Sequence, residues 1–397
     1  MTSLNISPKR LLIVTPDFPP KAGGVSLAAE ELAREFSNRQ YVVKVLTMAD
    51  RNLHQEDIPK GPSVLRLPSD VLHNLSSLAS LIDDLLASFD PHCVILNGTD
   101  KRFIFWVADH LQRRFAIPII YRSHGTATSL PVFFRWNKPP AFGIKSWIVA
   151  ILQARRWIRQ ASKFSQNVFL SSQQGIFKNY DRRLANKWKL RNTSNIPNTF
   201  PSVKLDKTAF REKYKLNGIF YAYIAGFSSR KNQIGAIRAL KRSRILDVSF
   251  VFIGPERNQY AEKSEKAAGD DPRFVFLYNI PRQDVIEAQN AMDCCMLFAT
   301  HEQQPLVILE AMSCHKPWIC TNVGSVGEMK GGIVLEKRSP RHLLDALETM
   351  QNPLTRKRYG DEGFEQWRKF YSPEIVYARW DRLLDDIIVK KTVGSGY

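Results

Sequence analysis

Two glutamates in the C-terminal half of the chain, Glu302 and Glu310, have a residue type and a spacing suited to chemistry. They follow the apolar run of residues 294–298, which is typical of a buried strand. Pro305 suits the first position of a helix, because its missing N–H costs no hydrogen bond there. The pattern therefore predicts Glu302 on the loop after the strand and Glu310 about a turn and a half into the helix.

The spacing alone leaves two interpretations of these acids open. An unpaired buried charge is strongly unfavourable, so one interpretation is that both carboxylates face a ligand at the carboxyl edge of a sheet. The alternative is that Glu302 is a solvated loop residue and Glu310 lies on the exposed surface of the helix.

Two cations in the loop of residues 226–232 form a second candidate group. The apolar run 220–225 ends just before this loop, and a helical pattern starts near Asn232. Lys231 can meet a diphosphate as a point charge, and Arg230 can meet it with a bidentate guanidinium. The alternative is a pair of solvated loop cations.

The N-terminal half offers weaker signals. Gly23 and Gly24 lie between an apolar run and a helical pattern over residues 25–36, and free amides at a helix N-terminus favour phosphate. A tight turn without a ligand is the alternative. The loop lacks the GxGxxG fingerprint, so an NAD site is not supported. His124 closes another apolar run, where a structural role is the alternative to a site role.

Composition limits the class of protein. The chain has 397 residues with 44% hydrophobic and 24% charged residues, the balance of a globular protein with two domains. No apolar run reaches the roughly 18 residues that span a bilayer, and no apolar signal-peptide core precedes the first strand, so we expect no export. Five cysteines in or beside apolar runs predict a reduced protein with buried thiols. The net charge of +19 predicts anionic partners without choosing among them.

Alternation of apolar runs and helical periodicity predicts two doubly wound parallel sheets. The expected strands of the first domain are residues 11–14, 41–46, 64–67, 93–96, 117–121 and 167–170, and its expected helices are 25–36, 75–88, 102–115 and 146–162. The expected strands of the second are 220–225, 248–253, 273–277, 293–298, 318–321 and 332–335, and its helices are 233–241, 259–268, 281–289, 305–314 and 340–350. We expect an N-terminal domain over 1–195, a linker over 196–208, a C-terminal domain over 209–370 and a helix over 371–397 that returns to the N-terminal domain.

These segments resemble the GT-B retaining glycosyltransferases, specifically glycosyltransferase family four, also called the group 1 glycosyltransferases. Glu302 and Glu310 match the E-x7-E motif of that family. Other segments agree in order and placement, namely Gly23-Gly24, His124, Ile196-Pro197-Asn198, the loop 226–232 and the stretch 323–328. The resemblance covers nearly the whole chain and implies two Rossmann-like domains that face a central cleft, followed by C-terminal helices.

The resemblance also implies roles for these residues. His124 and Glu302 are the expected catalytic residues, and Glu310 is expected to bind the ribose of the nucleotide. The expected donor diphosphate-binding residues are Arg230, Lys231, Gly24 and Leu306, and the expected donor sugar-binding residues are Gln303, Gln304 and Pro305. Two departures stand out: Phe227 occupies the usual position of an arginine, and Gln303-Gln304 replaces the usual Gly-Phe or Ser-Phe. No D-x-D pair follows a strand, so we expect a metal-independent enzyme without a cofactor.

The segment of residues 121–191 is strongly basic, with Asp181 as its one acid. It predicts a membrane or acceptor surface that docks on anionic lipid, formed by Phe133, Phe134, Trp136, Arg155, Arg156 and Arg159. One alternative is a helix that packs on its own sheet with a solvated basic face. Nucleic-acid binding also explains the charge, but no recognised motif accompanies it.

The resulting prediction is a cytoplasmic transferase, peripheral on the inner face of the plasma membrane. It moves a sugar from a nucleotide-diphosphate donor to a glycan or a lipid-linked acceptor, in cell-surface polysaccharide or glycolipid synthesis. The alternatives are a nucleotide-sugar-binding protein without transfer activity and a basic nucleic-acid-binding protein.

Overall fold

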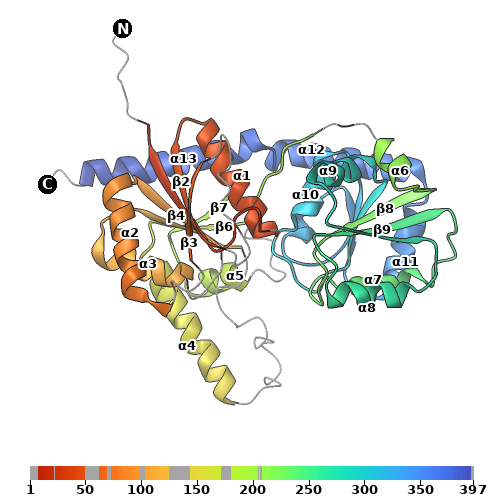
Figure 1. Cartoon of the computed structure of the whole chain (residues 1–397), viewed down its shortest axis with the longest axis horizontal. Helices are drawn as coiled ribbons and strands as arrows, with labels where there is room; N and C mark the ends of the chain where they lie inside the picture. The colour runs from red at the N-terminus through yellow and green to blue at the C-terminus, as the bar shows by residue number, and fades with distance from the viewer. Residues whose placement is uncertain are drawn as a thin grey trace, which may run out of the picture. The chain divides into compact units, whose positions relative to one another are not determined.

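A computed structural model of the chain describes residues 8–21, 23–49, 62–68, 73–98, 103–124, 144–170, 180–203, 205 and 208–394. These residues form two compact units, each built on a parallel sheet (Figure 1). The first unit holds residues up to Leu170, the residues from 180 to Ile196, and those from Tyr377 onward; the second holds the described part of Pro197–Val376.

The described strands of the first unit form one seven-stranded sheet in the order β3-β2-β1-β4-β5-β6-β7. Its central strands consist almost entirely of buried apolar residues, as expected of parallel strands covered on both faces. The strands are β1 (Arg10–Thr15), β2 (Val42–Met48), β3 (Ser63–Leu67), β4 (Cys93–Asn97), β5 (Ile119–Arg122), β6 (Gln166–Phe169) and β7 (Thr193–Asn195). The helices are α1 (Gly24–Asn38), α2 (Leu75–Phe89), α3 (Phe103–Arg114), α4 (Ile144–Ala161) and α5 (Tyr180–Lys187).

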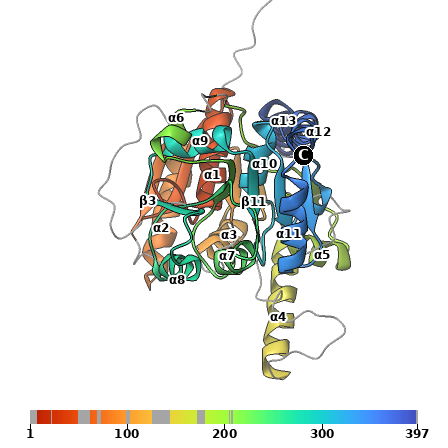
Figure 2. The ribbon, with the colours of Figure 1, turned by 90° about the vertical axis from the view of Figure 1, so that its right-hand side faces the viewer.

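The described strands of the second unit form a six-stranded sheet in the order β10-β9-β8-β11-β12-β13. The strands are β8 (Ile219–Ile224), β9 (Val248–Gly254), β10 (Phe274–Tyr278), β11 (Cys294–Leu297), β12 (Trp318–Thr321) and β13 (Gly332–Leu335). The helices are α6 (Ala209–Lys213), α7 (Gln233–Leu240), α8 (Gln259–Ala268), α9 (Arg282–Ala291), α10 (Leu306–Ser313), α11 (Pro340–Thr349) and α12 (Pro353–Phe370). One face of the sheet is covered by α7, α8 and α11, and the other by α6, α9, α10 and α12 (Figure 2).

The strand order gives each sheet a point where successive connections run to opposite sides. In the second unit this point lies between β8 and β11, which are neighbours in the sheet. The loops that follow these two strands therefore diverge at the carboxyl edge, where open α/β sheets bind ligands. In the first unit β1 and β4 are the corresponding neighbours. The candidate residues lie on the loops of these edges.

The final helix, α13 (Pro373–Gly394), continues the chain after α12. From Tyr377 onward it belongs to the first unit. The rings of Tyr377 and Trp380 pack edge-on against Phe36 of α1, and the Asp381 carboxylate accepts a hydrogen bond from Arg39 at 2.9 Å. Buried aromatic area and an ion pair thus hold this helix on α1.

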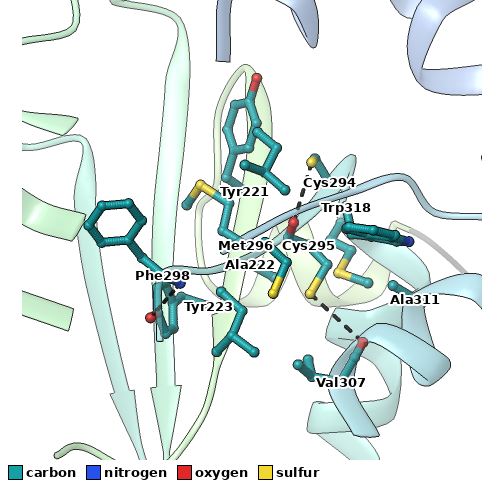
Figure 3. Close-up of a cluster of buried hydrophobic side chains, with 14 of the residues drawn as sticks. Tyr221, Ala222, Tyr223, Cys294, Cys295, Met296, Phe298, Val307, Ala311 and Trp318 are labelled. Atoms are coloured by element: carbon teal, nitrogen blue, oxygen red, sulfur yellow. Dashed lines mark hydrogen bonds between the residues drawn. The ribbon is translucent and has the colours of Figure 1, made fainter. Parts of the chain in front are cut away.

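The structure confirms the predicted two-sheet α/β architecture and corrects several local expectations. The sequence did not predict α5, α6 or β7, because α6 is short and β7 consists of polar, half-buried residues at a sheet edge. Pro305 is the N-cap of α10 rather than its first helical residue, with an extended backbone at ψ 115°. Of the five predicted buried thiols, that of Cys314 is partly exposed. Burial raises the pKa of the thiols of Cys294 and Cys295, which lie in the core of the second unit (Figure 3).

Candidate active site

Lys231 and Glu302 form an ion pair at the carboxyl edge of the second sheet. The Lys231 Nζ atom lies 2.7 Å from Glu302 Oε1, and the two side chains are only 18% and 11% exposed. Lys231 comes from the loop after β8 and Glu302 from the loop after β11, so neighbouring strands bring them together. The solvated-loop interpretation of Glu302 is therefore wrong.

Hydrogen bonds fix the backbone that carries Lys231. The Tyr223 hydroxyl accepts a hydrogen bond from the N–H of Phe298 at 2.9 Å (Figure 3). It donates one to the carbonyl oxygen of Lys231 at 2.5 Å. The side chain of Asn232 donates to the carbonyl oxygen of Phe298 at 3.2 Å. Asn232 has a left-handed backbone with φ 58°, a conformation that asparagine tolerates better than most residues. These contacts tie the loop after β8 to the end of β11.

Arg230 differs from Lys231 in its surroundings. Its carbonyl oxygen accepts a hydrogen bond from the N–H of Thr300 at 2.8 Å, while its side chain is exposed. Within the described part of the second unit, its guanidinium takes part in none of the ion pairs. Arg230 is therefore available to an anionic ligand.

Phe227 is a core residue. Its ring is buried and packs near the rings of Phe276 and Tyr278, with centroid distances of 6.3 and 5.4 Å. Gly254 makes room for it, because a Cβ atom at that position would lie 2.6 Å from the Phe227 ring. The loop backbone thus directs residue 227 into the core, where a phenylalanine adds apolar packing and no cation faces the edge.

Glu310 is buried in α10. Its Oε2 accepts a hydrogen bond from the side-chain amide of Gln289 on α9 at 2.6 Å. Burial raises the pKa of Glu310 to about 7, although the charges of Arg282 and Lys231 and the bond from Gln289 oppose this shift. A helix-surface position for Glu310 is therefore wrong. Hydroxyl donors from a ligand would favour the charged carboxylate.

Gln303 and Gln304 are both buried, and their loop is held from two sides. The Gln304 side-chain oxygen accepts a hydrogen bond from the N–H of Asn198 at 2.6 Å, while the Gln304 amide nitrogen has no hydrogen-bond partner among the described residues. The carbonyl oxygen of Gln303 accepts from the N–H of Ser325 at 2.7 Å. Gly324 is required beside it, because a Cβ atom there would lie 1.9 Å from that oxygen.

Pro305 and Leu306 begin α10 beside these residues. Pro305 is buried and caps the helix without a side-chain hydrogen bond. The first amides of any helix lack partners within it and carry partial positive charge. The expected amide contribution of Leu306 thus has a structural basis at this helix start.

In the first unit, Asn97 orients His124. The Asn97 side-chain oxygen at the end of β4 accepts a hydrogen bond from the Arg122 guanidinium at 3.2 Å. It lies 2.7 Å from His124 Nε2, so this ring nitrogen must carry the proton and Nδ1 is left as an acceptor. Burial and the charge of Arg122 hold the pKa of His124 well below its usual range. His124 is therefore a neutral hydrogen-bond acceptor at its Nδ1 atom.

Gly24 is the first residue of α1, and Gly23 precedes it with φ 150°. A Cβ atom at Gly23 would meet no heavy atom within 4 Å. The start of α1 thus has open space beside it, at the edge where β1 and β4 are neighbours. This position suits the anion-binding interpretation without testing it.

The basic surface is only partly described. Arg155, Arg156 and Arg159 are exposed on α4, and two apolar residues of the same helix, Ile148 and Leu152, are 47% and 57% exposed. Trp157, on the same helix, is buried. The N-terminal part of α4 extends away from the sheet of its own unit (Figures 1 and 2). The predicted surface residues Phe133, Phe134 and Trp136 lie outside the described residues.

The sequence did not point to four residues whose hydrogen bonds position the candidate site residues. They are Tyr223, Asn97, Arg122 and Gln289. Asn97 had a usable signal, because a polar residue closes an apolar run at the carboxyl end of a strand. The other three are identified only by their contacts.

In the described part of the chain, no helix is long and apolar enough to cross a membrane.

The second unit is similar to known glycosyltransferases. Residues 206–366 match the family model of the group 1 glycosyl transferases. A segment of 70 residues is 39% identical to an uncharacterized glycosyltransferase of Methanocaldococcus jannaschii, and this match spans 16% of the present chain and 20% of that relative.

Two solved structures resemble the whole fold. Sucrose-phosphate synthase from Thermosynechococcus elongatus matches 96% of this chain and 100% of its own, with a TM-score of 0.77 and 15% identity. An α,α-trehalose-phosphate synthase (UDP-forming) from Burkholderia xenovorans matches 95% of this chain and 100% of its own, with a TM-score of 0.68 and 12% identity. The chain thus has the GT-B fold, and its residues 206–366 match the family model of the group 1 glycosyl transferases.

Proposed function

We propose that this protein is a retaining glycosyltransferase that uses a nucleotide-diphosphate sugar. The observation that carries the proposal is the Lys231–Glu302 ion pair beside the start of α10, the helix that holds Glu310. A cation for the diphosphate, an acid for the sugar and an acid for the ribose then lie on two adjacent loops and one helix of the second unit. Together these three side chains suit the binding of a nucleotide-diphosphate sugar.

We assign the donor contacts as follows. Glu310 accepts hydrogen bonds from the ribose hydroxyls, and Lys231, the exposed Arg230 and the amide of Leu306 bind the diphosphate. Gln303, Gln304 and Pro305 contact the transferred sugar, where the Gln304 amide nitrogen supplies a donor. In the first unit, Gly24 contributes helix N-terminal amides to the diphosphate.

Lys231 has two partners in this proposal. Without donor it is paired with Glu302; with donor it turns its charge to the diphosphate, and Glu302 then lies beside the reacting face of the sugar. Neither charge of this pair is left without a partner in the free protein, which would be strongly destabilising. After this exchange of partners, the Lys231 ammonium group lies where negative charge develops on the leaving diphosphate, and it stabilises that charge.

The reaction in this proposal proceeds on one face of the sugar. The bond between the anomeric carbon and the phosphate oxygen breaks, and the acceptor hydroxyl oxygen bonds to the same carbon from the same side. The proton of that hydroxyl passes to the departing phosphate oxygen, so no general base from the protein is required. The protein contributes orientation and charge stabilisation. His124 takes part by accepting a hydrogen bond at Nδ1 from a sugar hydroxyl.

We further propose that transfer requires neither metal nor cofactor, and that the acceptor is a glycan or a lipid-linked sugar of cell-surface polysaccharide or glycolipid synthesis. The exposed arginines and apolar side chains of α4 support a cytoplasmic protein that docks on the anionic inner face of the plasma membrane. The basic helix would then hold the protein close to a lipid-linked acceptor.

A second candidate function is nucleotide-sugar binding without transfer. It is favoured by Phe227, whose burial in the core leaves the usual arginine position without a cation. The two candidates differ in turnover. Screening UDP-, GDP- and ADP-sugars for release of nucleoside diphosphate, with the product anomer read by NMR, tests both. Turnover with retained anomeric configuration supports the transferase. Tight donor binding without turnover supports the second candidate, and an inverted product contradicts the proposed mechanism.

A further inference from the structure

A cavity in the second unit contains none of the residues assigned to the donor, although two of its lining residues, Asn232 and Phe298, also help to hold the loop of Lys231. It has a volume of about 630 Å³ and lies at the carboxyl ends of β11, β12 and β13, bounded by α7 and by the start of α11. Its volume falls in the range of small-molecule sites, roughly 300–1,000 Å³. It therefore has the size of a ligand site in its own right.

Basic side chains converge on this cavity from two directions. Arg238 lies on α7 one turn after Gly235, and Arg242 follows on the same side in the turn that ends the helix. Lys337 and Arg338 come from the loop between β13 and α11. The four cations belong to segments far apart in the sequence, and they meet because α7 and α11 pack side by side.

These four cations differ from other arginines of the same unit. Arg273 pairs with Asp271 at 2.7 Å, and Arg257 pairs with Glu265 at 2.7 Å. None of the ion pairs within the described part of this unit includes a cation of the cavity. All four side chains are exposed, so solvent screens their mutual repulsion, but the cavity still presents an excess of positive charge to an anionic ligand.

One acid, Glu336, also lines the cavity and offsets one of the four positive charges. The Glu336 Oε2 atom accepts a hydrogen bond from the side-chain amide of Asn322 at 2.8 Å. The start of α11 adds positive potential, since Ser339 caps the helix without a side-chain hydrogen bond and the first amides of a helix favour anions. Charge, hydrogen-bond donors and volume thus agree on a small anion.

We propose that this cavity binds a small phosphate ester, with Arg238, Arg242, Lys337 and Arg338 as the phosphate-binding residues. Guanidinium groups match phosphate oxygens in bidentate geometry, and the mostly polar lining leaves room for a hydroxylated body. The inference does not rest on the proposed function, because no residue of the donor site lines the cavity. The cavity is a second ligand site of this unit.

The test is isothermal titration calorimetry on the full chain with glucose 6-phosphate, inorganic phosphate and glucose. We expect glucose 6-phosphate to bind at one site per chain, inorganic phosphate to bind more weakly and glucose not to bind. Arg238→Gln with Arg338→Gln should weaken glucose 6-phosphate binding roughly tenfold or more, as expected for lost charge-assisted hydrogen bonds. Thermal denaturation verifies that the double variant remains folded.

The matched control is Arg257→Gln with Arg341→Gln, which removes the same charge from exposed positions of the same unit. This pair should leave the affinity unchanged, and saturating nucleoside diphosphate should not displace glucose 6-phosphate. Equal loss in both pairs of variants would show nonspecific charge attraction and overturn the site. Complete displacement by nucleoside diphosphate, equal affinity for inorganic phosphate, or no binding of glucose 6-phosphate would each overturn the proposal as well.

Discussion

Lys231 and Glu302 share an ion pair of 2.7 Å across two loops that only the sheet brings together. Each charge satisfies the other in a poorly exposed place, so neither residue can be read as a solvated loop side chain. The pair also explains how a donor site can hold a cation and an acid before any ligand arrives.

Removal of either partner should lower transfer strongly, and the protein should stay folded at reduced stability because the remaining charge loses its partner. Lys231→Ala and Glu302→Ala are each expected to lower turnover roughly a hundredfold or more, the effect of losing a group that stabilises charge in the transition state. Initial rates of nucleoside diphosphate release measure this. Lys369→Ala, at an exposed position of α12, is the control. Near-normal turnover in both site variants would remove these residues from the mechanism.

Glu310 should give stability a characteristic pH dependence. Burial raises its pKa from 4.5 to about 7, so the folded protein retains a proton that the unfolded chain releases in this window. The carboxyl group then costs stability progressively as pH rises from about 4.5 to about 7 and costs a constant amount above it.

Glu310→Gln removes this titration and keeps an acceptor for Gln289. Its free energy of unfolding, relative to the parent, should therefore rise with pH across that window by at most about 3.5 kcal/mol, at about 1.4 kcal/mol per pKa unit. Urea denaturation at a series of pH values measures the difference. A difference that stays flat with pH would contradict the buried, raised-pKa carboxyl.

His124 should be the Nε2–H tautomer and neutral at about pH 7. The hydrogen bond to the Asn97 oxygen requires a proton on Nε2, and burial together with the charge of Arg122 disfavours a second proton on Nδ1. Nitrogen-15 shifts of the imidazole report the tautomer directly. Asn97→Asp introduces a carboxylate beside the ring and should raise the pKa of His124, since a neighbouring negative charge favours imidazolium. A protonated Nδ1 in the parent would refute the assignment of Nδ1 as the acceptor.

Phe227→Arg should fail to restore the family cation. The substitution places a charge among Phe276 and Tyr278 and removes a buried ring, so we expect a loss of about 3 kcal/mol or more in the free energy of unfolding. Phe370→Arg, at a half-exposed site, is the matched control and should change stability little. If the Phe227 variant were as stable as the control and more active, residue 227 would have to face the donor.

Binding to liposomes should require anionic lipid and weaken with added salt. Each basic residue near such a surface contributes about 1 kcal/mol, so Arg155→Gln, Arg156→Gln and Arg159→Gln together should weaken binding roughly a hundredfold. Sedimentation with vesicles of phosphatidylglycerol or phosphatidylcholine measures this. Arg356→Gln, Arg358→Gln and Arg368→Gln form the control with equal loss of charge. Equal binding to both lipids would exclude electrostatic docking by α4.

The two-sheet architecture could be predicted from the sequence, because apolar runs separated by helical patterns favour parallel sheets covered by helices. It also placed Lys231 and Glu302 on loops after strands, at the edge where such sheets bind ligands, and Glu310 in the following helix. The spacing left ligand-facing and solvated positions open, and the roles came from the family resemblance. The edge strand β7 was not predicted, because its residues are polar and it forms a strand only by pairing with the adjacent strand of the sheet.

Which of these residues are paired, buried or exposed depends on the tertiary packing. The adjacency of β8 and β11 pairs Lys231 with Glu302, the packing against Gly254 turns Phe227 into the core, and the end of β4 presents Asn97 to His124. Each of these contacts joins segments far apart in the sequence. Local patterns specify elements, but only the packing of elements specifies which charges are paired, which are buried and which remain available for a ligand.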